Sequence, residues 1–187
     1  MKKDDSIRQR LTEDSIRQTF EQTISERAQR YLKVKPHGII PFTPFAPASS
    51  ECGLLFRDGH FYGCIALTQA VAEAITRFLC IRNSWKPAKV FKTNIDKLHK
   101  RGFISQDIKN KFLNLWKNRN DYHHLNPEIE TDLKELEKIA LKKLLCLKDI
   151  EAEVFQFSIN DGKLLPKNPK YWAVNQDGTA QVFLRLE

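Results

Sequence analysis

Apolar residues recur every three or four positions over most of residues 60–150, and this spacing is typical of packed helices. Residues three and four apart lie on one side of an α-helix, so a stripe of this kind faces a hydrophobic core. The segment from His60 to about Arg82 therefore predicts a helix that is buried along one side. Its buried stripe is predicted to carry Phe61, Ile65, Ala72, Ile75 and Leu79.

Chain breakers divide the rest of this region into further helices. Pro87 precedes one helix and Gly102 follows it, Ser105 provides a side-chain cap for the next, and Pro127 ends that one. The expected helices cover about 88–100, 105–124 and 128–150. Their buried faces are predicted to carry Ile108, Phe112, Leu115, Leu133, Leu136, Ala140, Leu144 and Leu147.

The N-terminal part predicts a helix, a linker and a second helix. Ile16, Phe20, Ile24 and Tyr31 recur at helical spacing in a highly charged segment, which predicts an amphipathic helix over residues 4–33. Prolines then mark an extended linker over 35–48, which brings Phe42 and Phe45 onto the core. Ser49 or Ser50 is expected to cap the helix that follows, and the turn dipeptide Asp58-Gly59 to end it.

The C-terminal part changes from helical spacing to alternation. Phe155, Phe157 and Ile159 alternate with polar residues before a turn at Asp161-Gly162, and the alternation returns at Val182, Leu184 and Leu186. We expect a small antiparallel sheet, joined through residues 163–172 and packed on the helices. The predicted fold is mainly helical, an antiparallel bundle with a small β appendage. The expected regions are 1–34, a helix; 35–48, a linker; 49–150, the helical domain; and 151–187, the sheet.

Length and composition exclude several classes of protein. The 187 residues, 41% of them hydrophobic, suffice for one domain with a small appendage. No stretch approaches the ~20 apolar residues of a membrane span, and the first residues lack the apolar core of a secretory signal, so we expect a cytoplasmic protein without a membrane partner. Four cysteines without Cys-x-x-Cys pairing, and none beside a histidine at ligand spacing, predict reduced, largely buried thiols and no metal site.

The net charge of +8 is concentrated in one block. From Arg82 to Arg119 there are eleven Lys and Arg residues against two acids, whereas the rest of the chain is close to neutral. Aromatic residues are interspersed in this block, which is typical of a polyanion-binding surface but also of a core helix with a solvated lysine face. If the surface binds RNA, the residues expected to do so are Lys109, Lys111, Lys117 and Trp116.

The strongest candidate for a catalytic site is the segment Arg119-Asn120-Asp121-Tyr122-His123-His124. Helical spacing continues the buried face from Leu115 onto Arg119, where an apolar residue is expected. At about 100° per residue, Arg119, Asn120, His123 and His124 share less than half of the helix circumference. Arginine binds phosphate oxygens and histidine moves protons near neutral pH, so the group suits a phosphate substrate. Alternatively, Arg119 pairs with a buried acid such as Glu73, and the histidines only end a helix.

This segment resembles the motif of HEPN-domain ribonucleases, in which an arginine and a polar residue are followed by three arbitrary residues and a histidine. The context is also similar. Asp58-Gly-His-Phe-Tyr62 leads into an Ala-rich helix with Glu73, and the motif ends the second of two further helices. The resemblance covers about residues 49–150, whereas the N-terminal helix and the C-terminal sheet lie outside it.

The resemblance implies a metal-independent endoribonuclease without a cofactor, in a toxin–antitoxin or phage-defence setting. Its composite site forms when two motif helices meet, so one motif per chain implies a homodimer through the helix over 105–124. Residue by residue, Arg119 matches the arginine, Asn120 the polar position and His124 the histidine. His123 has no counterpart but lies close in angle to Arg119, so it remains a candidate catalytic residue, and Tyr122 is expected to support the site.

Some features limit what this resemblance implies. HEPN toxins with a nucleotidyltransferase antitoxin often carry a tyrosine two residues beyond the histidine. This chain has Asn126 there, which argues against modification of that position by a partner enzyme. A cognate antitoxin or regulator remains an expected partner. Glu73 is placed for a pair with Arg77, one helical turn on, and we favour this over a role in orienting Arg119. Two alternatives stay open: a non-catalytic HEPN-like module that binds nucleic acid or scaffolds an assembly, and a helical protein-interaction domain.

Overall fold

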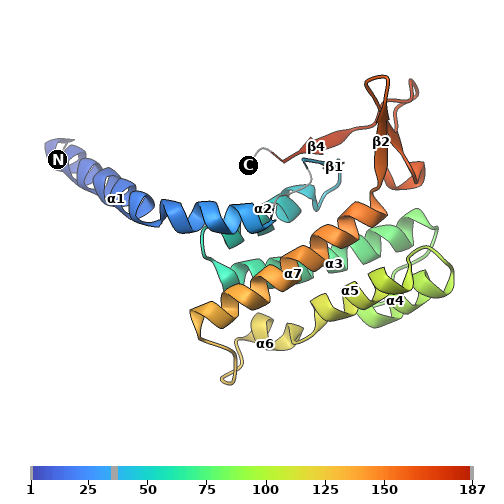
Figure 1. Cartoon of the computed structure of the whole chain (residues 1–187), viewed down its shortest axis with the longest axis horizontal. Helices are drawn as coiled ribbons and strands as arrows, with labels where there is room; N and C mark the ends of the chain where they lie inside the picture. The colour runs from blue at the N-terminus through green and yellow to red at the C-terminus, as the bar shows by residue number, and fades with distance from the viewer. Residues whose placement is uncertain (1, 35–37, 186–187) are drawn as a thin grey trace.

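A computed structural model describes residues 2–34 and 38–185 and is mainly helical, with two small antiparallel sheets (Figure 1). The fold class expected from the sequence is confirmed at this level. The predicted linker residues 35–37 and the strand residue Leu186 lie outside the described residues. The elements in chain order are α1 Lys2–Val34, β1 Ile39–Pro41, α2 Ala46–Arg57, α3 Phe61–Arg82, α4 Phe91–Lys100, α5 Gln106–Trp116, α6 Arg119–His124, α7 Leu133–Val154, β2 Phe157–Asn160, β3 Lys163–Pro166, the 3-10 turn η1 Pro169–Tyr171 and β4 Val182–Leu184.

The core is built around α3, which contacts α2, α4, α5, α6 and α7. The predicted stripe of α3 is buried throughout, as are the predicted faces of α5 and α7, except for Leu133, which is exposed at the start of α7. Although no stretch was expected to approach a membrane span, α3 is the one helix in the described part of the chain that is long and apolar enough to cross a membrane. Because 56% of that stretch is buried in the bundle, as in core helices of soluble proteins, this is weak evidence for a membrane span.

The start of α2 differs from the prediction. The helix begins at Ala46 with Pro47 in its first turn, where a missing backbone N–H costs nothing. Neither Ser49 nor Ser50 caps it, because both lie inside the helix. Ser49 is buried and hydrogen-bonds to Glu151 of α7 and Arg185 at the C-terminus. Of the two linker aromatics, only Phe45 reaches the core, since Phe42 is 58% exposed.

The C-terminal strands do not form the single sheet that was expected. β2 pairs with β3 across the turn at Asp161-Gly162, so residues 163–166 are a strand rather than part of a connection. β4 instead pairs with β1 in the predicted linker, with Ile40 opposite Phe183. The alternating pattern located β2 and β4 but not β1 or β3, and it carries no information about which strands pair. The second sheet therefore ties the C-terminal end of the chain to the segment before α2.

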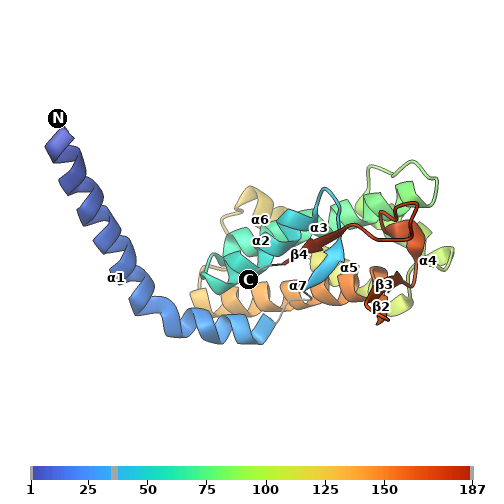
Figure 2. The same ribbon diagram turned by 90° about the horizontal axis from the view of Figure 1, so that it is seen from above.

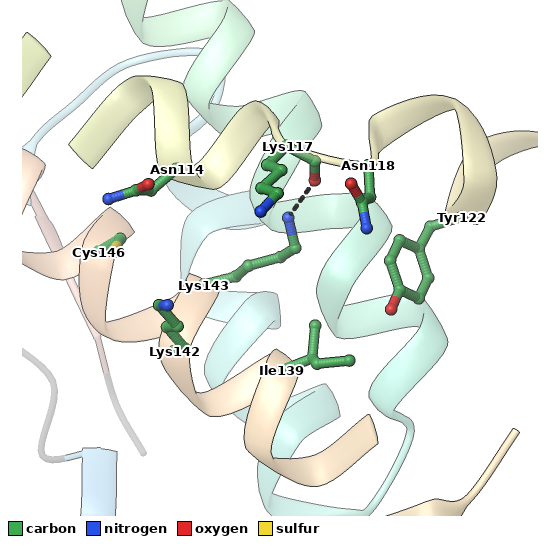
Figure 3. A pocket seen from close by; sticks show the side chains of 8 residues that line it. All are labelled: Asn114, Lys117, Asn118, Tyr122, Ile139, Lys142, Lys143 and Cys146. Carbon is green, nitrogen blue, oxygen red and sulfur yellow. Dashed lines mark hydrogen bonds between the residues drawn. The ribbon is translucent and has the colours of Figure 1, made fainter. Parts of the chain in front are cut away.

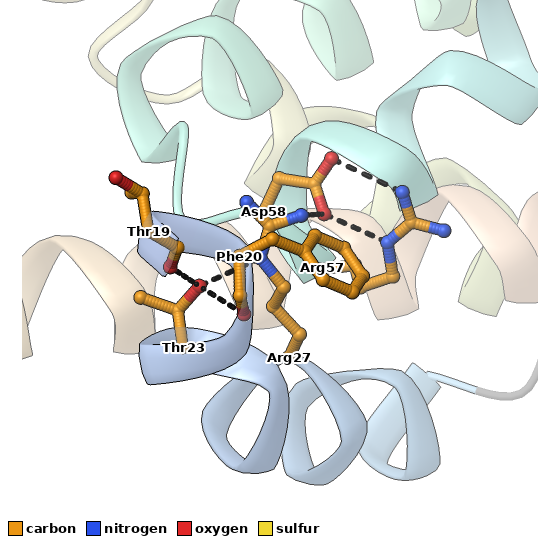
Figure 4. A network of polar contacts seen from close by, with 6 residues as sticks. All are labelled: Thr19, Phe20, Thr23, Arg27, Arg57 and Asp58. Atoms are coloured by element: carbon orange, nitrogen blue, oxygen red, sulfur yellow. Dashed lines mark hydrogen bonds and ion pairs between the residues drawn. The ribbon is translucent and has the colours of Figure 1, made fainter. Parts of the chain in front are cut away.

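The N-terminal helix is longer and less buried than its pattern suggests. Residues 5–22 are exposed, and this half of α1 projects away from the bundle (Figure 2). The predicted apolar face is therefore uncovered here, with Ile16, Phe20 and Ile24 all about half exposed. Only the second half contacts the bundle, where Arg27 forms a 2.9 Å ion pair with Asp58 after α2 (Figure 4).

Candidate functional site

The helix predicted over 105–124 is broken just before the motif. Ser105 caps α5 as expected by accepting a hydrogen bond from the backbone N–H of Ile108, but α5 ends at Trp116. Asn118 then adopts a left-handed backbone conformation, with φ of 60°, and a separate short helix, α6, carries the motif. Arg119 consequently does not continue the buried face of α5. The motif therefore lies on a helix of its own and not on the continuation of α5.

Side chains from two neighbouring helices hold this break. The last carbonyl groups of a helix lack backbone partners and need other donors. Lys143 of α7 donates to the carbonyl oxygens of Leu115 and Lys117, at 2.8 Å each. Gln69 of α3 donates to the same two oxygens, at 3.0 and 3.4 Å. The end of α5 is thereby bound to α3 and α7 and not continued as helix.

A tyrosine anchors α6 while its histidines stay exposed. Tyr122 is buried and lies 6.4 Å from the ring of Tyr62 of α3, measured between centroids. Asn126 donates a 2.7 Å hydrogen bond to Asp121, and Leu125 ends the helix in a left-handed conformation. The exposed residues of α6 are Asn120, His123 and His124. Tyr122 is therefore the buried residue of α6, and its supporting role at the site stays a prediction.

Arg119 is half-buried and unpaired with any acid among the described residues. Its guanidinium lies 4.9 Å from the ring centroid of Trp116, and its Nε is buried without a hydrogen-bond partner. The alternative in which Arg119 pairs with Glu73 is not observed, because Glu73 forms a 2.7 Å ion pair with Arg77, as favoured from the sequence. An arginine that is neither neutralised nor fully solvated is placed to bind an anion.

His123 lies within electrostatic reach of Arg119. Partial burial lowers the pKa of His123, the positive charges of Arg119 and His124 lower it further, and only Glu73 acts in the opposite direction. Since an unperturbed histidine has a pKa of about 6.5, His123 is mainly neutral at pH 7. A neutral imidazole beside a cation can accept a proton from a substrate that the cation binds. The motif histidine, His124, is exposed on the same turn.

The chain matches no family model, no curated protein and no solved structure. Among the described residues, no three His, Cys, Asp or Glu side chains gather to hold a metal ion. Three of the four cysteines are buried, in agreement with the prediction, and Cys146 is half-buried; all four thiols are free.

The residues expected to bind RNA are not equally placed to do so. Lys109 is paired with Asp96 at 2.8 Å, and Lys111 with both Asp107 and Asp149. The ring of Trp116 stacks on Phe91 at 3.9 Å, with an interplanar angle of 15°, and also lies under Arg119. Lys117 alone of the four is exposed without an acidic partner among the described residues. The structure thus leaves Lys117 as the strongest of these candidates.

Three residues that shape the site were not predicted from the sequence. Gln69 and Lys143 fix the break, and Asn118 makes the turn, yet none of them was singled out. A signal existed for Lys143, because it lies three residues after Ala140 on the predicted buried face of its helix. A lysine at such a position needs acceptors inside the fold.

Proposed function

We propose that this chain is a metal-independent endoribonuclease of the HEPN type, acting at the motif on α6. The observation that carries the proposal is the half-buried guanidinium of Arg119, which is unpaired with any acid among the described residues and lies on the same short helix as two exposed imidazoles. The phosphate of RNA supplies the charge that Arg119 lacks. The sequence motif and the position of α6 after α5 support the same assignment.

In the proposed reaction the RNA 2′-oxygen attacks the adjacent phosphorus, and the bond from phosphorus to the 5′-oxygen breaks. A histidine of α6 in one copy accepts the 2′-hydroxyl proton, and a protonated histidine of α6 in the second copy donates a proton to the leaving 5′-oxygen. Arg119 binds the phosphate and stabilises the charge that develops on its oxygens. The products carry 2′,3′-cyclic phosphate and 5′-hydroxyl ends. The motif assigns the base to His124, whereas the coupling to Arg119 favours His123.

The proposal includes a homodimer, because each chain supplies one motif. Two copies of α6 facing each other would provide two arginines and the separate acid and base that the reaction needs. The exposed face of α6 continues into Leu125, which is 66% exposed beside His124. An apolar side chain at that position suits a contact with a second copy.

The test is cleavage of labelled single-stranded RNA by purified full-length protein in EDTA. Arg119→Ala and His124→Ala are each expected to lower turnover at least ~10²-fold with the dimer intact, and His123→Ala less. Arg101→Ala is the matched arginine control, since Arg101 also lies over a tryptophan, 4.6 Å from the ring of Trp85. His60→Ala is the histidine control, because His60 is exposed and its side chain caps nothing.

The outcomes separate the proposal from its alternatives. If His123→Ala abolishes turnover and His124→Ala is mild, the motif register is wrong but the ribonuclease proposal stands. If neither histidine matters and the fold is intact, the ribonuclease proposal fails. If the wild-type protein retards RNA without cleaving it, the chain is a binding module. If it neither cleaves nor retards RNA, a protein-interaction domain is indicated.

A further inference from the structure

A small cavity lies behind the motif, between the end of α5, the start of α6 and the middle of α7 (Figure 3). Its volume is about 220 Å³. Lys117, Lys142 and Lys143 line it together with the amide side chains of Asn114 and Asn118. No Asp or Glu is among the lining residues. The cavity therefore collects three positive charges with no negative charge in its wall.

The three ammonium groups differ in how they are held. Lys143 is buried and uses two of its three N–H donors on the carbonyl oxygens at the end of α5. Lys117 and Lys142 are exposed, and neither has an acidic partner among the described residues. Burial lowers the pKa of Lys143 to about 8; Cys146 acts in the opposite direction, and repulsion by Lys142 and Lys117 lowers it further. The lysines are thus close enough to repel one another, as an anion site without its anion would be.

An adjoining hollow has the opposite charge. It shares Asn118, Tyr122 and Ile139 with the first but is larger, about 700 Å³. Asp121, Glu128 and Glu130 line it. A phosphate would be repelled there and attracted to the lysine cavity. Of these two adjoining hollows, only the lysine cavity therefore suits an anion.

We propose that the lysine cavity is a phosphate-binding site, separate from Arg119 and the histidines. Three lysines and two carboxamides line one cavity, and their donors suit the several oxygens and the negative charge of a phosphate group. The source is either a backbone phosphate of RNA that also reaches α6, or a small phosphate-bearing ligand. Because Lys117 and Asn118 form the turn into α6, a bound phosphate would also fix the direction of the motif helix.

Alkylation of Cys146 can report whether the cavity is occupied. Cys146 lines it and is half-buried, whereas the other three cysteines are buried. Alkylation of the folded full-length protein should therefore begin at Cys146, which mass spectrometry can verify. Inorganic phosphate, added at constant ionic strength with chloride as the exchanged anion, is expected to slow alkylation of Cys146 several-fold. The concentration dependence gives the Kd for phosphate.

The decisive variant replaces both exposed lysines, Lys117→Gln with Lys142→Gln, and leaves Lys143 to hold the α5 end. Its Kd for phosphate should rise at least ~10-fold, because two charged hydrogen-bond donors are lost. The control is Lys86→Gln with Lys134→Gln, which removes the same charge from two exposed lysines outside the cavity. It should bind phosphate within about twofold of the wild type, since only long-range attraction changes. Equal binding by both double variants, or no protection of Cys146 in the wild type, overturns the proposal.

A second arm distinguishes the two sources. A single-stranded RNA without terminal phosphates that protects Cys146 in the wild type, but not in the Lys117/Lys142 variant, identifies an RNA backbone phosphate. Protection by inorganic phosphate alone identifies a small ligand. The RNA arm rests on the proposed function, whereas the phosphate arm does not. Loss of cleavage in Arg119→Ala with phosphate protection retained would show that the two sites are separate.

Discussion

A buried ion pair connects the C-terminal end of the chain to the core, and removing one partner should destabilise the fold strongly. Arg185 follows β4 and lies 2.6 Å from Glu151 of α7, and both side chains are only 1% exposed. Arg185 also donates a 2.6 Å hydrogen bond to Ser49 of α2. Three segments far apart in sequence therefore meet at one guanidinium. Arg185→Met would leave the carboxylate of Glu151 buried without its counter-charge.

The expected cost follows from burial. Breaking a buried pair by removing one partner costs about 3–5 kcal/mol, because the remaining charge is poorly solvated. For a chain of this size, 1 kcal/mol corresponds to about 2–4 °C in Tm, so Arg185→Met should lower Tm by roughly 6–20 °C. The surface pair of Arg27 and Asp58 provides the comparison, with both side chains more than 20% exposed. Arg27→Met should cost no more than about 1 kcal/mol.

Urea unfolding followed by circular dichroism measures both variants. The triple variant Ser49→Ala, Glu151→Leu, Arg185→Met removes the whole polar group and should recover most of the lost stability, since apolar replacements of a buried pair are often neutral or stabilising. A loss below about 1 kcal/mol in Arg185→Met would refute the reasoning. So would a triple variant as unstable as the single one, because the loss would then come from packing and not from an unpaired charge.

Three further predictions concern the proposed site. RNA cleavage should persist in EDTA and leave 2′,3′-cyclic phosphate or 3′-phosphate ends; a strict need for Mg²⁺, or 3′-hydroxyl ends, would contradict it. Sedimentation should show a homodimer at micromolar concentration, and a fully active monomer would exclude the composite site. NMR titration should give His123 a pKa below 6.5, and Arg119→Gln should raise it because a nearby positive charge is removed. In the wild type, His123 binds its proton more weakly in the folded than in the unfolded state. This histidine therefore makes the free energy of unfolding rise with pH just below 6.5.

The sequence predicted the helices well because the signal for a buried helix is local and repeated. The stripe from Phe61 to Leu79 needs only its own spacing to indicate which side of α3 faces the core. Strand pairing has no such local signal. The alternating residues around Phe183 fit either partner, and only the folded chain shows that they pair with Ile40 and not with the hairpin. In α1, helical spacing predicted an apolar face that includes Phe20, but it does not show whether any other part of the chain packs on that face, and Phe20 is exposed.

The break at Asn118 was not predicted because no glycine or proline marks it. Asparagine tolerates the left-handed conformation better than most residues, but it does so in only a minority of its occurrences. What settles the conformation here is non-local, since Lys143 and Gln69 bind the carbonyl groups that a continued helix would have used. Lys143 lies on the buried face of α7, which indicates that it needs acceptors, but its position in the sequence does not show that those acceptors are the carbonyl groups at the end of α5.

The same non-local contacts decide how the motif presents its side chains. On a continued α5 helix, Arg119 would follow Leu115 into the core. The turn at Asn118 instead leaves Arg119 half-buried, with Tyr122 taking the buried position of α6 and both histidines reaching solvent. A substitution that frees the end of α5, such as Lys143→Met, would therefore act on the direction of Arg119 without touching it. The six residues of the motif define which groups are available, and Gln69 and Lys143 define where those groups point.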